Sequence, residues 1–176
     1  MSESSLSRRV IRRKVDRTQK LIVFRLRQQW FAIPIEFAYK LIQQAQIYGQ
    51  FDETGIGFTL YQGRELQVID IERRIFSFPQ LLLPDRINGS LINSAQIKTT
   101  DAFKPYLLIL QNAQNELIGI SIKTQLTLRR VIRSAFVPVP ATYQTEGNIP
   151  YISAFVIIDS TEPPLFLLNL NQLMRS

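Results

Sequence analysis

The chain has 176 residues, of which 45% are hydrophobic, and it carries a formal net charge of +7 with neither cysteine nor histidine. This length and apolar content suffice for one compact domain, or for two small barrels that share an interface, and they exclude disorder of the whole chain. The absence of cysteine and histidine excludes thiol nucleophiles, imidazole general bases, disulfides and zinc sites built on those ligands.

The first twenty residues carry most of the net charge. They contain seven Lys and Arg against Glu3 and Asp16, whereas the remainder contains fourteen against twelve acidic residues. Such charge runs are commonly solvated, so we expect residues 1–19 to form a flexible basic tail. The same cations could instead bind nucleic acid, an anionic membrane surface or an acidic partner. The apolar runs are too short for a signal peptide or a membrane-spanning helix, which favours a cytoplasmic protein.

The first structured unit is predicted to be a β-hairpin. Apolar and charged residues alternate toward the end of the run from Leu21 to Leu26, Gln28 and Gln29 interrupt the pattern, and the stretch from Trp30 to Ile35 resumes it. The segment 36–43 contains neither Gly nor Pro, and it suits either a helical turn or an irregular strand.

A second hairpin is predicted around a Gln62-Gly63 turn, because glycine tolerates the positive φ that a tight turn demands. Its second strand, from Arg64 to Ile71, has apolar residues in both phases, which predicts either a bulge or burial on both faces. We interpret Asp70 and Glu72 as a solvated, ion-paired strand end rather than as a catalytic carboxylate pair. Residues 77–104, rich in Pro, Ser and Asn, are predicted to be a connector.

The second half of the chain repeats the first. Residues 106–132 again contain an apolar strand, a polar turn and a strand with period-two alternation, as in residues 20–42. The closing strands also correspond, with 66–71 matching 166–170. Two similar β-units follow from this pattern.

The sequence offers little chemistry of its own. It has no Gly-rich phosphate loop and no dinucleotide-binding glycine pattern, so no cofactor is expected. The aromatic residues occupy core-like strand positions rather than a basic face, which favours packing over stacking on nucleic-acid bases. A binding module is therefore preferred over an enzyme.

Four segments in order resemble the CheW family of chemotaxis coupling proteins. They are LIVFRLRQQWFAIPIEFAYKLI at 21–42, LYQGRELQVIDIERR at 60–74, the stretch 117–131, and LFLLNLNQL at 165–173. The resemblance implies an all-β domain over residues 20–176, built of two intertwined five-stranded SH3-like barrels with short helices. The chain departs from the family pattern at four motif positions: Gln62 stands where arginine is usual, Gln67 where proline is usual, and Lys123 and Asn169 where aspartates are usual.

The resemblance also implies a function. A family member is a non-catalytic adaptor that binds the regulatory domain of a CheA-type histidine kinase and, in a groove between the barrels, the signalling tip of a chemoreceptor. Family breadth extends the expected output to pilus-driven or surface motility. The partner-binding residues it suggests are Ile35, Ala38, Lys40, Gln62, Gly63 and Arg64. The alternative function is a basic-tailed barrel that binds nucleic acid or an anionic membrane surface.

Overall fold

The computed structural model describes residues 17–43, 46–48, 51, 55–76, 106–140 and 151–174. The predicted connector and most of the predicted tail lie outside these residues. The elements in chain order are β1 (Thr18–Leu26), β2 (Gln29–Pro34), η1 (Ile35–Phe37), β3 (Ala38–Gln43), β4 (Ile56–Tyr61), β5 (Arg64–Asp70), α1 (Ile71–Phe76), β6 (Tyr106–Gln111), β7 (Leu117–Ile122), β8 (Thr127–Ile132), η2 (Arg133–Ala135), β9 (Phe136–Pro138), β10 (Ile152–Val156), β11 (Leu165–Leu168) and α3 (Leu170–Leu173).

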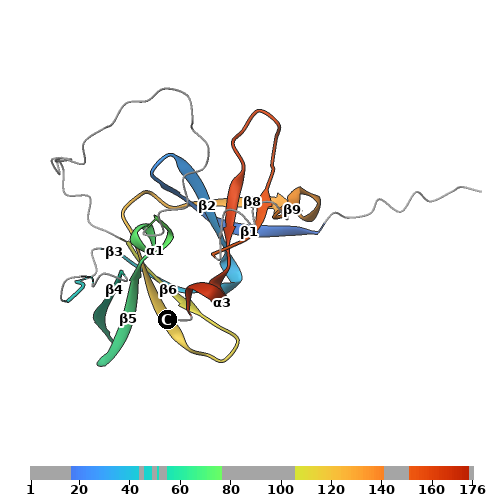
Figure 1. The fold of residues 1–176 in the computed structure, drawn as a ribbon. Coiled ribbons are helices and arrows are strands. Elements are labelled where there is room, and N and C mark those ends of the chain that lie inside the picture. Colours follow the sequence, from blue (N-terminus) through green and yellow to red (C-terminus); the bar gives the residue numbers. More distant parts are fainter. Residues whose placement is uncertain are drawn as a thin grey trace, which may run out of the picture.

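The strands form two sheets, and each sheet takes strands from both halves of the sequence (Figure 1). The first sheet has the order β8-β1-β2-β11-β10-β9 and the second has the order β3-β6-β7-β5-β4. The opening hairpin of one half is therefore completed by the later strands of the other half. This exchange is the intertwined, all-β arrangement that the family resemblance implies.

The internal repeat is confirmed by the strand orders. The series β8-β1-β2-β11-β10 corresponds strand for strand to β3-β6-β7-β5-β4. Each sheet also contains one parallel pair at the same place, β2 with β11 and β5 with β7, while the other pairs are antiparallel. The first sheet has a sixth strand, β9, beyond the five expected. Its counterpart in the second sheet is a single bridge between Tyr48 and Phe58.

The two predicted hairpins are present. β1 pairs with β2 from Leu21↔Pro34 to Leu26↔Gln29, so the turn contains Arg27, whose φ is 54°. β4 and β5 are joined by Gln62 and Gly63, with φ values of 51° and 75°. Two consecutive positive φ angles are the pattern of a type I′ turn, whose twist matches that of the flanking strands.

β5 is buried on both faces, so of the two possibilities predicted for it, a bulge or burial on both faces, the second is correct. Val68, Ile69 and Asp70 are all buried in succession, and the β4–β5 register runs without a shift. One face packs into the main core, and the other packs against β6 through Leu107 and Ile109. Gly119 on β7 permits this close packing, because a Cβ there would lie 2.7 Å from Leu107 Cδ1.

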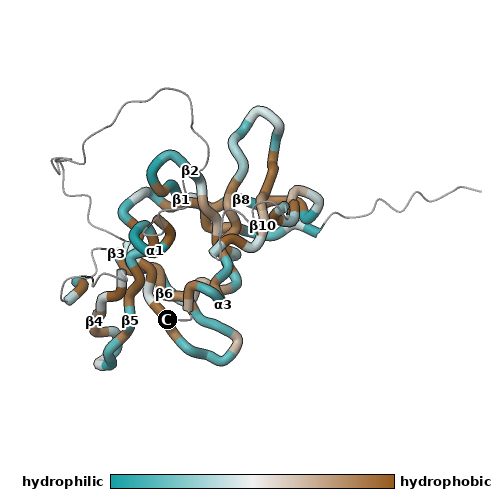
Figure 2. Tube along the Cα trace, viewed as in Figure 1, coloured by the Kyte–Doolittle hydropathy of each residue, from teal (hydrophilic) through white to brown (hydrophobic). Residues whose placement is uncertain are grey.

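The main core lies between the two sheets and under both short helices. It joins residues of β1, β2, β5, β6 and β7 with buried residues of α1 and α3, including Ile71, Ile75, Leu170 and Leu173. Within this core, the Phe31 ring packs against three other rings, those of Phe24, Phe76 and Phe166. Figure 2 shows the hydrophobic residues along the strands and the hydrophilic residues at the hairpin tips.

Both helices begin with the same capping arrangement. Asp70 Oδ1 accepts a hydrogen bond from the Arg73 backbone N–H at 3.1 Å, and the Asn169 side chain accepts one from Gln172 N–H at 3.3 Å. The backbone N–H of each cap also donates to the residue before an incoming strand, Asp70 to Gly55 and Asn169 to Tyr151. Since asparagine caps helices about as well as aspartate, Asn169 preserves this contact.

The interpretation of Asp70 and Glu72 as a solvated strand end is wrong. Asp70 is only 1% exposed, and Glu72 belongs to α1 rather than to a strand. The ion pairing was correct in part, because Lys123 Nζ lies 3.1 Å from Asp70 Oδ2. The segment 36–43 combines both possibilities that the sequence left open, since a short 3-10 turn leads directly into β3. β1 begins at Thr18 and so includes the last two residues of the predicted tail.

Candidate partner-binding groove

An apolar groove of about 450 Å³ lies between β3 and β8. Each of these strands is the last strand of its sheet, and the two strands correspond in the internal repeat. The groove therefore lies where the two halves of the molecule meet. Its lining residues are Ile22, Ile35, Ala38, Tyr39, Lys40, Leu41, Leu108, Leu126, Thr127 and Leu128.

The walls of the groove expose large apolar side chains. Leu128 is 66% exposed, Tyr39 50% and Leu41 45%. Ile22 and Leu108 belong to the main core and are buried, so they form a rigid apolar floor. Scattered apolar residues are normal on a protein surface, but a hollow that gathers several of them suits a protein partner.

A β-bulge shapes the β3 wall. The register of β3 against β6 shifts between Ala38 and Lys40, so Tyr39 has no directly paired residue on β6. A bulge re-aims side chains and bends the strand. This explains why three consecutive residues of β3, Tyr39, Lys40 and Leu41, are all exposed.

The structure brings together three of the six residues that the resemblance suggested. Ile35, Ala38 and Lys40 line the groove, and the two apolar ones are half-buried rather than enclosed in the core. Gln62, Gly63 and Arg64 are exposed and form the β4–β5 turn, which is not part of the groove lining. The predicted set therefore occupies two separate surfaces.

One contact links Lys40 to the surface formed by the β4–β5 turn. Its Nζ lies 5.9 Å from the centre of the Tyr61 ring, although β3 and β4 are the two opposite edges of their sheet. The sheet must curl for these edges to approach each other, as in a barrel. Tyr61 directly precedes the turn, so the groove and the turn are neighbouring features of one curled sheet.

The second wall of the groove was not predicted from the sequence. Leu126, Thr127 and Leu128 come from the second half of the chain, and they face β3 only because β8 lies at the edge of the other sheet. The alternation of Leu126 and Leu128 was visible in the sequence. No local pattern indicates that this stretch lies opposite residues 38–41.

Lys40 is the charged residue among those that line the groove. In the described part of the chain, Lys40 and Arg64 take part in none of the four ion pairs, which are Arg27–Glu72, Arg73–Asp70, Lys123–Asp70 and Arg129–Glu162.

Asp159, a carboxyl outside the groove, has a lowered pKa. The Thr161 backbone N–H donates to Asp159, in the β10–β11 connection, and lowers the pKa of that exposed carboxyl.

The described residues contain no group of three or more acidic, His or Cys side chains that could hold a metal ion. Among the same residues, no helix is long and apolar enough to cross a membrane. The groove has an apolar lining and one lysine, which suit the binding of a protein partner. Its lining residues place no nucleophile in contact with a general base.

Comparison with known proteins identifies the type of fold. No family model and no curated protein sequence matches the chain. The crystal structure of the scaffolding protein TtCheW from Thermoanaerobacter tengcongensis is similar to it with a TM-score of 0.65, at 13% sequence identity. The similarity covers 91% of this chain and 94% of that chain. This similarity establishes a CheW-like fold.

Proposed function

We propose that this protein is a non-catalytic adaptor of the cytoplasm that couples a chemoreceptor to a CheA-type histidine kinase in a chemotaxis-like pathway. The observation that carries the proposal is the apolar groove between two free strand edges, where Leu128, Tyr39 and Leu41 are exposed. The likeness of the fold to a CheW scaffolding protein supports the same role.

The groove fits the receptor side of this role. An amphipathic helix buries its apolar face in a hydrophobic groove, using residues spaced at i, i+3, i+4 and i+7. The half-buried Ile35 and Ala38 and the exposed Leu128 would contact such a face. Lys40 at the rim would favour a segment with an acidic residue beside its apolar stripe.

The β4–β5 turn is the proposed kinase-side contact. Arg64 is exposed and outside the ion pairs of the described residues, while Phe58 and Leu60 on the adjoining edge strand β4 are 44% and 63% exposed. Apolar anchors beside a free arginine are typical of protein interfaces. A regulatory domain built on a related double barrel would dock here through its own strand edge.

The receptor contact is tested with Leu128→Asp. Placing a carboxylate in the groove removes about 1.5–3 kcal/mol of apolar burial, so affinity for a receptor signalling fragment should fall by about tenfold or more. Ile158→Asp is the matched control, because Ile158 is 42% exposed and does not line the groove. Titration calorimetry with both variants measures the difference. Equal affinities for Leu128→Asp and Ile158→Asp would refute the groove as the receptor site.

A further inference from the structure

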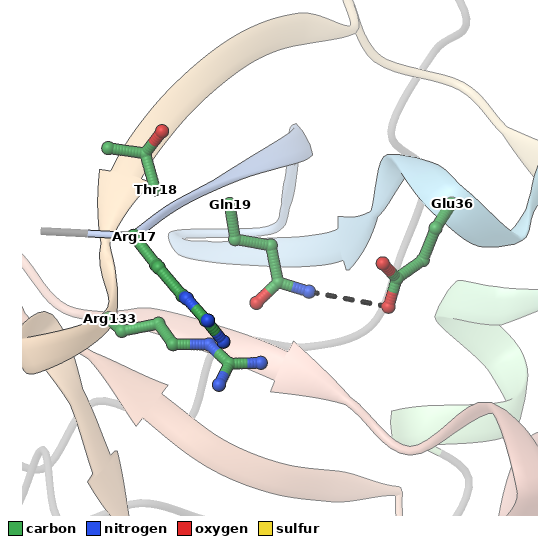
Figure 3. A pocket seen from close by; sticks show the side chains of 5 residues that line it. All are labelled: Arg17, Thr18, Gln19, Glu36 and Arg133. Carbon is green, nitrogen blue, oxygen red and sulfur yellow. Dashed lines mark hydrogen bonds between the residues drawn. The ribbon is translucent and has the colours of Figure 1, made fainter. Parts of the chain in front are cut away.

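A second hollow lies beside β1 and η2. It has a volume of about 320 Å³ and is lined by Arg17, Thr18, Gln19, Glu36 and Arg133 (Figure 3). We call it the arginine cleft. It shares no lining residue with the apolar groove, so it is a separate surface feature.

The fold holds two arginines at this cleft. Arg17 directly precedes β1, Arg133 opens η2 directly after β8, and the Arg133 backbone N–H donates to the Arg17 carbonyl at 3.0 Å. Figure 3 shows both side chains extending into the same region. In the described part of the chain, neither guanidinium belongs to an ion pair. Two like charges held together in this way favour a bound anion.

Two further cations lie on the neighbouring strands. Lys20 on β1 and Arg130 on β8 are both exposed and lie opposite each other in the β1–β8 register. Cations on β8 protect a free sheet edge against unwanted pairing. That explanation fits Arg130, but it does not extend to Arg17 and Arg133, which lie outside the strands.

The cleft also contains hydrogen-bonding groups of both kinds. Glu36 accepts from the Gln19 side-chain amide at 3.5 Å and is the acidic member of the lining. A carboxylate at this position repels the closely spaced phosphates of a nucleic acid or of an anionic membrane. It is compatible with a peptide, whose backbone N–H groups can donate to Glu36 while its acidic side chains meet the arginines.

We propose that the arginine cleft binds an acidic peptide segment of a protein partner. Arg17 and Arg133 would each donate paired N–H bonds to one carboxylate of the segment, and Gln19 and Glu36 would hydrogen-bond its backbone. The site goes beyond the groove and the turn of the proposed function, and it gives the protein a third contact surface selected by charge.

The probe is a short fluorescent peptide of alternating glutamate and serine, titrated into the full chain and followed by anisotropy at about 0.15 M salt, where the Debye length is about 8 Å. The double variant Arg17→Gln/Arg133→Gln should bind it about tenfold more weakly, because both bidentate contacts are lost. Glu36→Gln should bind it more tightly, because glutamine keeps a carbonyl acceptor for the peptide backbone and removes the negative charge that repels the peptide carboxylates.

The control is Arg12→Gln/Arg13→Gln, which removes the same charge from the neighbouring sequence and should change the affinity less than about twofold. Equal loss in the two double variants would overturn the site in favour of diffuse attraction, and so would the absence of peptide binding. Duplex DNA and vesicles of anionic phospholipid are titrated in parallel. Tighter binding of either one, with the same dependence on Arg17 and Arg133, would also overturn the peptide assignment.

Discussion

Replacing Asp70 by alanine removes a helix cap and the ion pairs with Lys123 and, at 4.0 Å, Arg73, and the structure allows the cap and the Lys123 pair to be separated. The Asp70 side chain caps α1 through the Arg73 N–H at 3.1 Å, and it pairs with Lys123 Nζ, also at 3.1 Å. The cap belongs to the first half of the sequence, whereas Lys123 follows β7 in the second half. The substitution therefore tests both a local contact and a link between the two halves.

The free energy that each contact contributes depends on how far it is exposed to solvent. Loss of a helix cap costs about 1 kcal/mol. The Lys123 side chain is 55% exposed, so solvent screens the ion pair and its contribution is about 1 kcal/mol or less. Asp70→Ala should thus lower the free energy of unfolding by about 2 kcal/mol, or the melting temperature by about 4–8 °C. Asp70→Asn keeps a capping oxygen and should cost about half as much.

Thermal and urea unfolding of Asp70→Ala, Asp70→Asn, Lys123→Met and the double variant Asp70→Asn/Lys123→Met measures these terms. The double-mutant cycle should give a coupling energy of about 1 kcal/mol or less between residues 70 and 123. If Asp70→Asn destabilised the protein as much as Asp70→Ala, the capping argument would be refuted. A coupling energy of zero would show that the cross-half ion pair does not contribute.

Four further substitutions test the fold, the turn and the proposed kinase contact. Gly119→Ala should lower the free energy of unfolding by about 1–3 kcal/mol in urea unfolding, because its Cβ would overlap Leu107; Gly63→Ala, which meets no atom within 4 Å, should cost about 1 kcal/mol through its positive φ alone. Gln62→Gly should raise the urea midpoint by relieving the positive φ of 51°, and a lower midpoint would contradict the turn assignment. Arg64→Glu should weaken kinase binding in calorimetry with a nearly unchanged melting temperature, since Arg64 is exposed; a large melting shift without loss of binding would contradict its role.

Much of the fold could be predicted because its signals are local. The period-two alternation in β7 and the Gln62-Gly63 turn depend on neighbouring residues, and the repeat follows from comparing two such patterns. The exchange of strands between halves is not local. The pairing of β1 with β8 joins residues more than a hundred positions apart, and it was expected only through the family resemblance.

The candidate sites divide in the same way. Ile35, Ala38 and Lys40 were assigned through the family resemblance of the segment 21–42, but the opposite wall at Leu128 depends on the long-range meeting of two sheet edges. The arginine cleft depends on the backbone bond between Arg133 and Arg17, which also crosses the halves. Asp70 was placed on a solvated strand end because the sequence does not show that the helix begins directly after it.

The central claim is that one molecule couples two partners, and sequential titration calorimetry tests it most directly. The full chain is first saturated with the regulatory domain of the CheA-type kinase from the same cell, and a receptor signalling fragment is then titrated into that complex. The account predicts saturable one-to-one binding in both steps, because the β4–β5 turn and the apolar groove have no lining residue in common. Failure of either partner to bind, or displacement of the kinase domain by the receptor fragment, would contradict the adaptor function.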